Sequence, residues 1–485
     1  MDQNAAALNK ILDYFEQINA IPRCSKNEAR LGRWLADWAT ARGFAIDEDA
    51  AGNLVVRVPA SSGMAERPTV ILQGHMDMVC EKTPDSPHDF TRDPIRSHRE
   101  GDWLTADRTS LGADNGIALA YALALAEDPA VDHPPLELLF TVDEETGLNG
   151  VKELPPELIS GRILINLDSE DEGVFTIGCA GGMDTTLTMA LVREPFPEGW
   201  VPYEVLVGGL RGGHSGIDID KQRGNANKVL ARTLAHLGSR IAPAIATLSG
   251  GTRHNAIPRD ATAVIACPAE AVQTLMAATA EAQAIMRAEW QGVDEGLSIQ
   301  VRPLTTAPHT VWVADIAGRI INLLLALPDG VATMSTTLEG LVETSSNLAT
   351  VVVEGDNLCI LISQRSAVAS RLAALTGKVH AIAALAGATV SDSNKYPPWQ
   401  PDMAADLLNT ARTVYAELFG AQPVLQVIHA GLECAIIGER SPGMQMISFG
   451  PDIENPHSPT ERMHIPSVEK VWRFLVALLA RIGQK

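Results

Sequence analysis

The chain has 485 residues, of which 46% are hydrophobic and 20% charged, as expected for a soluble globular protein of two or more domains. Its formal net charge is -21 and it contains no lysine- or arginine-rich run, so nucleic acid is excluded as a partner. The longest apolar run, residues 117–126, is too short to span a membrane, and the N-terminus lacks the features of a signal peptide.

The first part of the chain alternates between helical and strand patterns. In chain order we predict a helix over 5–18, a second helix ending at Gly43, a hairpin of 44–46 and 54–58, a strand from Val70, an irregular loop over 81–107, a helix over 116–127, and strands over 136–142 and 163–167. This alternation predicts an α/β fold with a mixed, mostly parallel sheet covered by helices.

The pattern changes after residue 182. Two successive sets of helices and strands follow, and each resembles a β-α-β-β-α-β unit, which predicts an inserted α+β domain of two ferredoxin-like halves. A proline-rich connector, residues 396–401, leads back to helices and strands of the first kind. We therefore predict one domain made of residues 1–182 and 398–485, with 183–397 inserted into it.

The cysteines show no Cys-x-x-Cys spacing, which argues against a thiolate zinc site. All six lie far apart: Cys24, Cys80, Cys179, Cys267, Cys359 and Cys434. This spacing predicts free, mostly buried thiols in a reducing compartment, and we expect a cytoplasmic protein.

The strand that begins at Val70 carries His75 and Asp77, two residues apart. Side chains at i and i+2 point to the same face of a strand, so the imidazole and the carboxylate should stand side by side. A carboxylate in that position fixes the ring of a metal-binding histidine. Ordinary polar residues at a strand end are the alternative, and the pair alone is weak evidence.

Further acidic residues and a second histidine follow other predicted elements. Asp114 precedes a helix, where it could simply be the N-cap. Residues 143–145 are consecutive carboxylates, which repel one another unless a cation is present, although a solvated acidic loop is also consistent with them. Asp168 ends the next strand, and His457 lies between two prolines. Because strand ends meet at one edge of such a sheet, we expect these residues to converge around a pair of zinc, manganese or cobalt ions.

The sequence resembles the aminoacyl-histidine dipeptidases, a branch of the two-metal aminopeptidase and aminoacylase family. The resemblance extends from the first helix to the last. It is carried by Gly74-His75-Met76-Asp77-Met78-Val79, Leu111-Gly112-Ala113-Asp114-Asn115-Gly116, Asp143-Glu144-Glu145, Asn166-Leu167-Asp168-Ser169-Glu170, Gly178-Cys179-Ala180-Gly181-Gly182, Gly212-Gly213-His214-Ser215-Gly216, Asn255-Ala256-Ile257-Pro258-Arg259, His429-Ala430-Gly431-Leu432-Glu433-Cys434 and Pro456-His457-Ser458-Pro459.

The resemblance implies a role for each residue of the predicted centre. Asp114 would bridge two divalent ions, with zinc expected first. The remaining ligands would be His75 and Asp168 for one ion, and Glu145 and His457 for the other. Asp77 would orient His75. Glu144 would be the general base that takes a proton from a water whose pKa the ions would lower toward about 7, as the hydroxide attacks the peptide carbonyl.

The resemblance also implies that the inserted domain is a lid. His214, which by its glycine-rich surroundings could be a simple turn residue, would donate a hydrogen bond to the oxyanion. Asn255 and Arg365 would hold the terminal carboxylate of the substrate. One departure is that His254 stands between Arg253 and Asn255, whereas the family has an arginine immediately before the asparagine.

The activity implied is hydrolysis of small, unblocked dipeptides, preferably with a C-terminal histidine. Two alternatives stay open: an aminoacylase or amidase acting on N-acyl amino acids, and a metal-dependent binding protein without hydrolysis. The sequence also leaves the oligomeric state open. Shorter relatives borrow the lid histidine from a dimer partner, whereas a doubled lid could supply His214 from the same chain.

Overall fold

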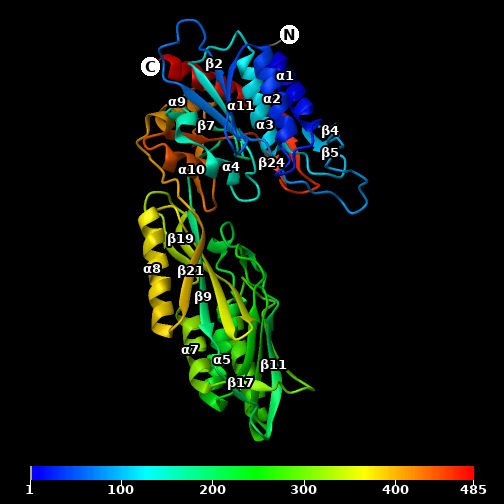
Figure 1. Cartoon of the computed structure of the whole chain (residues 1–485), viewed down its shortest axis with the longest axis vertical. Coiled ribbons are helices and arrows are strands. Elements are labelled where there is room, and N and C mark those ends of the chain that lie inside the picture. Colours follow the sequence, from blue (N-terminus) through cyan, green and yellow to red (C-terminus); the bar gives the residue numbers. More distant parts are fainter. Residues whose placement is uncertain (1–2, 485) are drawn as a thin grey trace. The chain divides into compact units, whose positions relative to one another are not determined.

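The computed structural model describes residues 3–484, which form two compact units (Figure 1). The terminal unit comprises the chain up to Cys179, Pro401–Val427 and the stretch from Leu432 onward. The inserted unit comprises Ala180–Gln400 and Ile428–Gly431. Among the described residues, no helix has the length and apolar composition that crossing a membrane requires.

The terminal unit is built on an eight-stranded sheet. Its strands are β1 (Ala45–Glu48), β2 (Leu54–Val58), β3 (Val70–His75), β6 (Leu136–Thr141), β7 (Ile163–Asn166), β8 (Val174–Cys179), β22 (Val424–Ile428) and β23 (Gln445–Ser448). They lie in the order β1-β2-β6-β3-β7-β23-β8-β22. The central strands β6, β3, β7 and β23 run parallel, while β2 and β8 join them antiparallel. The predicted mixed α/β fold is confirmed.

Helices cover this sheet. They are α1 (Gln3–Asn19), α2 (Ala29–Ala41), α3 (Ala113–Ala126), α4 (Asn149–Glu153), α9 (Asp406–Phe419), α10 (Glu433–Arg440) and α11 (Ile465–Gln484). Helix α3 packs against β3 and α1, and α11 packs against α1 and α9. Every residue of β3 and β6 is buried, which explains why both strands are apolar runs rather than alternating ones.

One local prediction in the terminal unit, the irregular loop, is wrong. The stretch 81–107 is not wholly irregular, because it contains the hairpin of β4 (Ser97–Glu100) and β5 (Trp103–Ala106). That hairpin is completed by β25 (Arg462–His464) and β24 (Ile453–Glu454), a pairing with distant residues that local pattern cannot reveal.

Cys24 and Cys80 form a disulfide with a Cα–Cα distance of 5.7 Å, so the prediction of free thiols fails for this pair. A backbone bridge between Cys24 and Met78 brings the two segments together, which the sequence separation of 56 residues conceals. Cys267, Cys359 and Cys434 are free thiols, as predicted.

The inserted unit is built on a nine-stranded antiparallel sheet. Its strands are β9 (Gly181–Ala190), β11 (Trp200–Gly208), β13 (Ala244–Gly250), β15 (Ala261–Pro268), β16 (Ser298–Pro303), β18 (Gly330–Met334), β19 (Val342–Glu354), β20 (Asn357–Ser366) and β21 (Thr389–Tyr396). The order is β16-β11-β15-β13-β19-β20-β9-β21, with β18 on β19. The helices are α5 (Ala226–Ile241), α6 (Val272–Glu289), α7 (Ala314–Ala326) and α8 (Ala369–Ala386).

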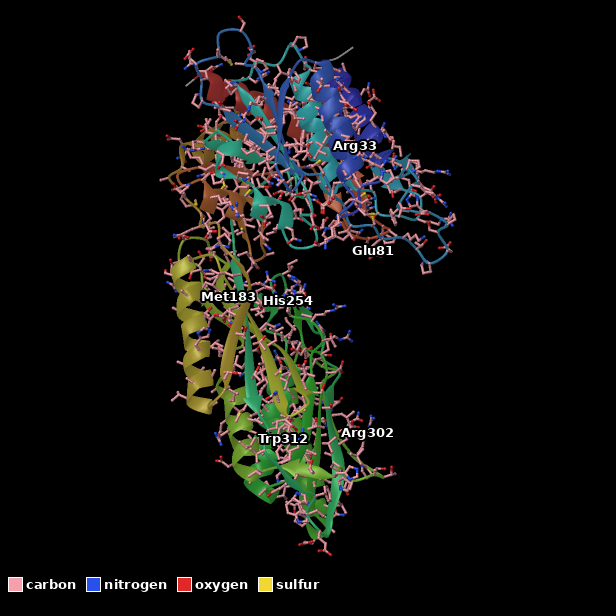
Figure 2. The ribbon with its side chains drawn as sticks, in the orientation of Figure 1. Arg33, Glu81, Met183, His254, Arg302 and Trp312 are labelled. Atoms are coloured by element: carbon pink, nitrogen blue, oxygen red, sulfur yellow. A yellow bond between two sulfur atoms is a disulfide. The ribbon has the colours of Figure 1, made fainter. Side chains whose placement is uncertain are left out.

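Each half of this sheet follows the element order β-α-β-β-α-β. One half uses β11, α5, β13, β15, α6 and β16, and the other uses β9, α7, β19, β20, α8 and β21. The second half therefore takes its first strand from before the first half, a strand that the sequence pattern does not reveal. Both halves share one apolar core, and Trp312, labelled in Figure 2, is only 1% exposed.

Candidate metal centre

The predicted ligands of the terminal unit lie on segments that leave its sheet at the carboxyl ends of the strands. His75 is the last residue of β3, the run 143–145 follows β6, and Asp168 follows β7. Asp114 lies in the first turn of α3, and His457 follows β24. Since β6, β3 and β7 are parallel, their ends share one edge, where ligands collect in α/β proteins.

Asp114 stands between the two histidines. Its Oδ1 lies 3.0 Å from His75 Nε2, and its Oδ2 lies 2.9 Å from His457 Nε2. His75 Nε2 is also 3.4 Å from Asp168 Oδ1, and His457 Nε2 is 3.1 Å from Glu145 Oε2. The structure thus brings all five predicted ligands together, in two groups that share Asp114.

The carboxylates raise the pKa of both rings. Hydrogen bonds to Asp114 and Glu145 raise the pKa of His457 to about 11. Burial opposes charge on His75, but Asp168, Asp114 and Asp77 raise its pKa well above the ordinary value. Burial, with the charges of Asp114 and Glu145 adding to it, raises the pKa of Asp168 to about 6. Three carboxylates thus lie against two histidines, of which His75 is buried and His457 is half exposed.

The donor set fits divalent cations. Imidazole and carboxylate without thiolate suit catalytic zinc, manganese or cobalt. Oε1 of Glu145 is buried and has no hydrogen-bond partner among residues 3–484, so that oxygen is left for another ligand. The ligand atoms of His75, Asp114 and Glu145 lie within 4.8 Å of one another, close enough to hold one ion.

Asp77 lies behind His75 rather than among the ligands, and it is fully buried. Its Oδ1 is 3.3 Å from His75 Nδ1 and accepts the backbone N–H of Glu144 at 3.0 Å. Its Oδ2 accepts the N–H of Glu145 at 3.2 Å and the Ser25 hydroxyl at 2.8 Å. One carboxylate therefore orients the imidazole and the acidic run together.

Replacing Asp77 with asparagine should weaken turnover more than it empties the site. An asparagine cannot accept from all of these donors, and losing such a partner typically costs about 10- to 100-fold in metal affinity or activity. We expect normal metal content at saturating zinc, measured by elemental analysis, together with a reduced kcat. A variant that holds no metal even at saturation would make Asp77 a ligand instead. His75→Ala is the matched control that should lose metal.

Sequence reasoning missed several buried partners of the site. Glu433, at the start of α10, accepts from Gln73 Nε2 at 2.6 Å and from the Thr141 hydroxyl at 2.8 Å, and burial raises its pKa to about 7. Glu170 is partly buried, and burial together with the charge of Asp114 raises its pKa to about 8. The available signal was a polar residue, Gln73, inside an otherwise apolar strand.

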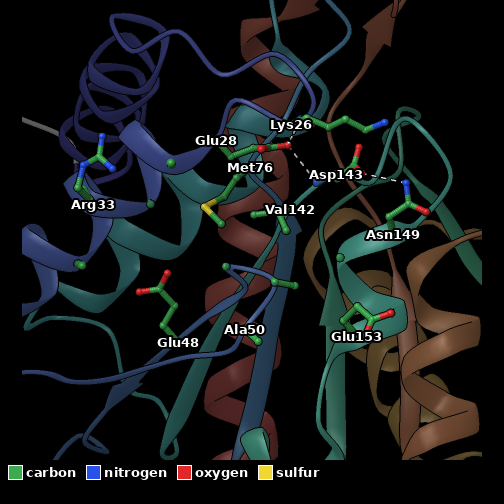
Figure 3. A pocket seen from close by; sticks show the side chains of 16 residues that line it. Lys26, Glu28, Arg33, Glu48, Ala50, Met76, Val142, Asp143, Asn149 and Glu153 are labelled. Atoms are coloured by element: carbon green, nitrogen blue, oxygen red, sulfur yellow. Dashed lines mark hydrogen bonds between the residues drawn. The ribbon is translucent and has the colours of Figure 1, made fainter.

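A separate cavity of about 580 Å³ lies in the terminal unit beside α2 and the turn between β1 and β2 (Figure 3). Met76 and Asp143 line it, but none of the predicted ligands does. At its wall, Glu28 Oε1 accepts the backbone N–H groups of Lys26 at 2.7 Å and Asp143 at 3.1 Å. This cavity is distinct from the metal centre.

The inserted unit brings its own predicted residues together. His214 in β12 (Gly213–His214) pairs with Ala256 in β14 (Ala256–Ile257), which places it beside the Asn255 backbone. Its Nδ1 accepts the N–H groups of Gly216 and Ile217, each at 3.2 Å, so the ring proton sits on Nε2. Burial and the charge of Arg365 lower the pKa of His214, which keeps the ring neutral and a donor.

Arg365 donates from Nη1 to the Tyr396 hydroxyl at 3.1 Å and to the His429 carbonyl at 3.4 Å. Its Nε is buried and has no hydrogen-bond partner among residues 3–484. His254, the residue that departs from the family pattern and is labelled in Figure 2, lies 3.0 Å from Asp184 through Nδ1. His254 therefore pairs with a carboxylate of its own unit.

The chain matches the sequence profile of peptidase family M20/M25/M40 over residues 71–481. It is 40% identical over 473 residues to the cytosol non-specific dipeptidase of Escherichia coli K12, covering 98% of this chain and 97% of that protein. The crystal structure of aminoacylhistidine dipeptidase from Vibrio alginolyticus superposes with a TM-score of 0.91 at 38% identity, covering 97% and 96% of the two chains.

Aminopeptidase PepT from Bacillus cereus shares the fold, with a TM-score of 0.57 at 17% identity over 98% of each chain. The resemblance inferred from the motifs is confirmed by the family profile and by the Escherichia coli relative, which aligns over nearly its whole length. This chain belongs to the M20/M25/M40 peptidase family and is a hydrolase of peptide bonds.

Proposed function

We propose that the protein is a dipeptidase that uses two divalent metal ions. The observation that carries the proposal is the division of five ligand side chains into two groups that share Asp114. His75 and Asp168 would complete one site, and His457 and Glu145 the other. We expect zinc first, with manganese or cobalt as alternatives.

The cations, when bound, supply an acidified water and polarise the peptide carbonyl. Glu144 would take the proton of the attacking water and hand it to the leaving amine. Its backbone is fixed by Asp77, and its side chain is buried next to the acidic ligands, which raises its pKa well above the ordinary value. A carboxylate beside the ligands that is not itself a ligand suits the role of general base.

The substrate class is supported by relatives of similar length. One is named a non-specific dipeptidase and another an aminoacylhistidine dipeptidase. We propose unblocked dipeptides as substrates, with a preference for histidine in the second position. The metal-loaded protein should be assayed with a matched panel: Xaa-His dipeptides, the same dipeptides with other second residues, tripeptides and N-acyl amino acids.

The panel separates the alternatives. Preferential cleavage of Xaa-His supports the full proposal, and equal cleavage of all dipeptides leaves a dipeptidase without the histidine preference. Turnover of N-acyl amino acids alone would identify an aminoacylase or amidase and overturn the dipeptidase proposal. No turnover of any member by protein shown to hold both metals would favour a metal-dependent binding protein.

In the inserted unit, we propose that His214 donates from Nε2 to the oxyanion of the tetrahedral intermediate, with this unit acting as a lid. The hydrogen bonds to Nδ1 place the proton on the required nitrogen. We expect His214→Ala to lower kcat by about 10²- to 10³-fold, the usual cost of losing an oxyanion donor. Metal content should be unchanged, and a variant with normal kcat would exclude the role.

Asn255 and Arg365 are proposed to hold the terminal carboxylate of the dipeptide. Arg365 suits the task because its buried Nε retains an unused donor, and a guanidinium can bind both carboxylate oxygens. Arg365→Lys should therefore raise KM for free dipeptides much more than for their C-terminal amides. Equal effects on both substrate types would remove Arg365 from carboxylate binding.

A homodimer remains part of the proposal because His214 could act from either chain. Mixing His214→Ala with Glu144→Gln, each strongly impaired alone, distinguishes the two arrangements. Recovery of activity in the mixture requires a His214 donated across a dimer, whereas no recovery supports action within one chain. Light scattering of the same samples gives the mass in solution.

We propose a cytoplasmic location, which the name of the Escherichia coli relative supports. Thiols are normally kept reduced in that compartment. Alkylation in fresh lysate followed by mass analysis of the Cys24 and Cys80 peptides tests the proposal alongside fractionation. A bridge that is fully formed in the cell would instead indicate an oxidising compartment.

A further inference from the structure

Glu461 lies four positions after His457 and is only 2% exposed. Its carboxylate accepts the backbone N–H groups of four consecutive residues. Oε2 accepts from Leu111 at 2.8 Å and Gly112 at 3.0 Å, and Oε1 accepts from Ala113 at 2.7 Å and Asp114 at 3.3 Å. One buried side chain thus binds the whole segment that leads into Asp114.

These N–H groups lie just before and at the start of α3, where donors have no partner within the helix. A local capping residue usually satisfies them, and from the sequence Asp114 could have been that cap. The structure shows Gly112 at the cap position with no side-chain hydrogen bond, and Glu461 in its place. The Asp114 carboxylate is consequently free to face His75 and His457.

A buried arginine binds the same segment and connects it to the end of β3. Arg23, which is 1% exposed, donates from Nη2 to the Gly112 carbonyl at 2.5 Å. Its Nη1 donates to the carbonyls of Met76 at 3.1 Å and Asp77 at 2.9 Å. The guanidinium therefore joins the backbone before Asp114 to the backbone after His75.

We propose that Glu461, supported by Arg23, is a positioning residue that sets the spacing of Asp114 between its two histidines. The backbone N–H of Glu461 also donates to Ser458 at 3.1 Å, which closes the turn immediately after His457. Glu461 therefore ties the His457 segment to the Asp114 segment, and Arg23 ties the latter to the His75 segment. Glu461 does not touch the substrate, and it acts through the ligands.

This inference rests on the proposed two-metal function, and metal affinity is the readout that tests it. Glu461→Gln keeps the size of the side chain, but its amide NH₂ would face backbone N–H donors that now meet a carboxylate oxygen. We expect a folded protein whose affinity for Zn²⁺, measured by competition with a chromophoric chelator, falls by about 10- to 100-fold. Glu461→Asp keeps the charge but shortens the reach, and should show a smaller loss.

Glu137 provides a matched control in the same unit. It is 1% exposed, pairs with Arg57 and accepts the backbone N–H groups of Ser160 at 2.9 Å and Gly161 at 3.0 Å. It lies near the opposite end of β6 from the acidic run. Glu137→Gln should therefore lower thermal stability while keeping the wild-type affinity for Zn²⁺.

The outcomes separate the two levels of the proposal. A wild-type protein that does not bind two Zn²⁺ ions would overturn the proposed function itself. Two ions in the wild type and unchanged affinity in Glu461→Gln would overturn only the positioning role. The same follows if Glu137→Gln loses as much affinity as Glu461→Gln, or if both Glu461 variants fail to fold while Glu137→Gln folds, because Glu461 would then be purely structural.

Discussion

Glu144→Gln should retain the fold and both metal ions and lose nearly all turnover. A general base contributes about 10²- to 10⁴-fold to such reactions, and glutamine has the same shape but cannot accept a proton. Because Glu144 is not one of the five ligands, metal content should not change. The measurements are kcat on a cleaved dipeptide, zinc content and the circular dichroism spectrum.

Asp143→Asn is the matched control within the same acidic run. The Asp143 carboxylate accepts from the Thr146 hydroxyl at 2.5 Å and from Asn149 Nδ2 at 2.9 Å, so it is directed away from the ligands. Its φ of 49° is one that asparagine tolerates. This variant should keep most of its activity. Near-normal turnover in Glu144→Gln would assign the base to another group.

Removal of the metals should abolish activity and destabilise the terminal unit. Without cations, the carboxylates of Asp114, Asp168 and Glu145 are left close together in a buried site. A ligand at 1,000 times its Kd stabilises the folded state by about 4.1 kcal/mol per site, and dialysis against a chelator removes that contribution. Calorimetry and turnover should be followed in the same samples.

Adding back zinc, manganese or cobalt identifies which ion restores turnover. The control is the same chelator presaturated with metal, which should have no effect on either measurement. Full activity in protein shown by elemental analysis to be free of metal would rule out the proposed mechanism. A loss of stability without a loss of activity would assign the cations a structural role alone.

Much of the terminal unit could be predicted because its helices and strands follow from patterns of neighbouring residues. Apolar runs such as β3 and β6 identify buried strands, and helical periodicity identifies α1, α9 and α11. Parallel strand ends share an edge of the sheet, so His75, Asp168 and the run 143–145 could be expected to meet. The motifs predicted the family, which the comparisons confirm.

Contacts between distant segments could not be predicted in this way. The disulfide of Cys24 with Cys80, the hairpin completed by β25 and the first strand of the second half of the inserted unit all depend on pairing across long separations. The energy of such pairs comes from burial and hydrogen bonds that exist only once the chain has folded. The residues next to a cysteine or a short polar strand do not indicate which distant segment it pairs with.

The sequence by itself therefore determined the peptidase family, the α/β sheet and the residues that meet at its edge. Only the tertiary structure decided how that edge is organised. The carboxylate of Glu461, 347 positions from Asp114, accepts backbone N–H groups that a nearby capping side chain would otherwise accept, and the Asp114 carboxylate faces His75 and His457. The need for a cap is local and visible in the sequence, whereas the residue that satisfies it is set by the fold.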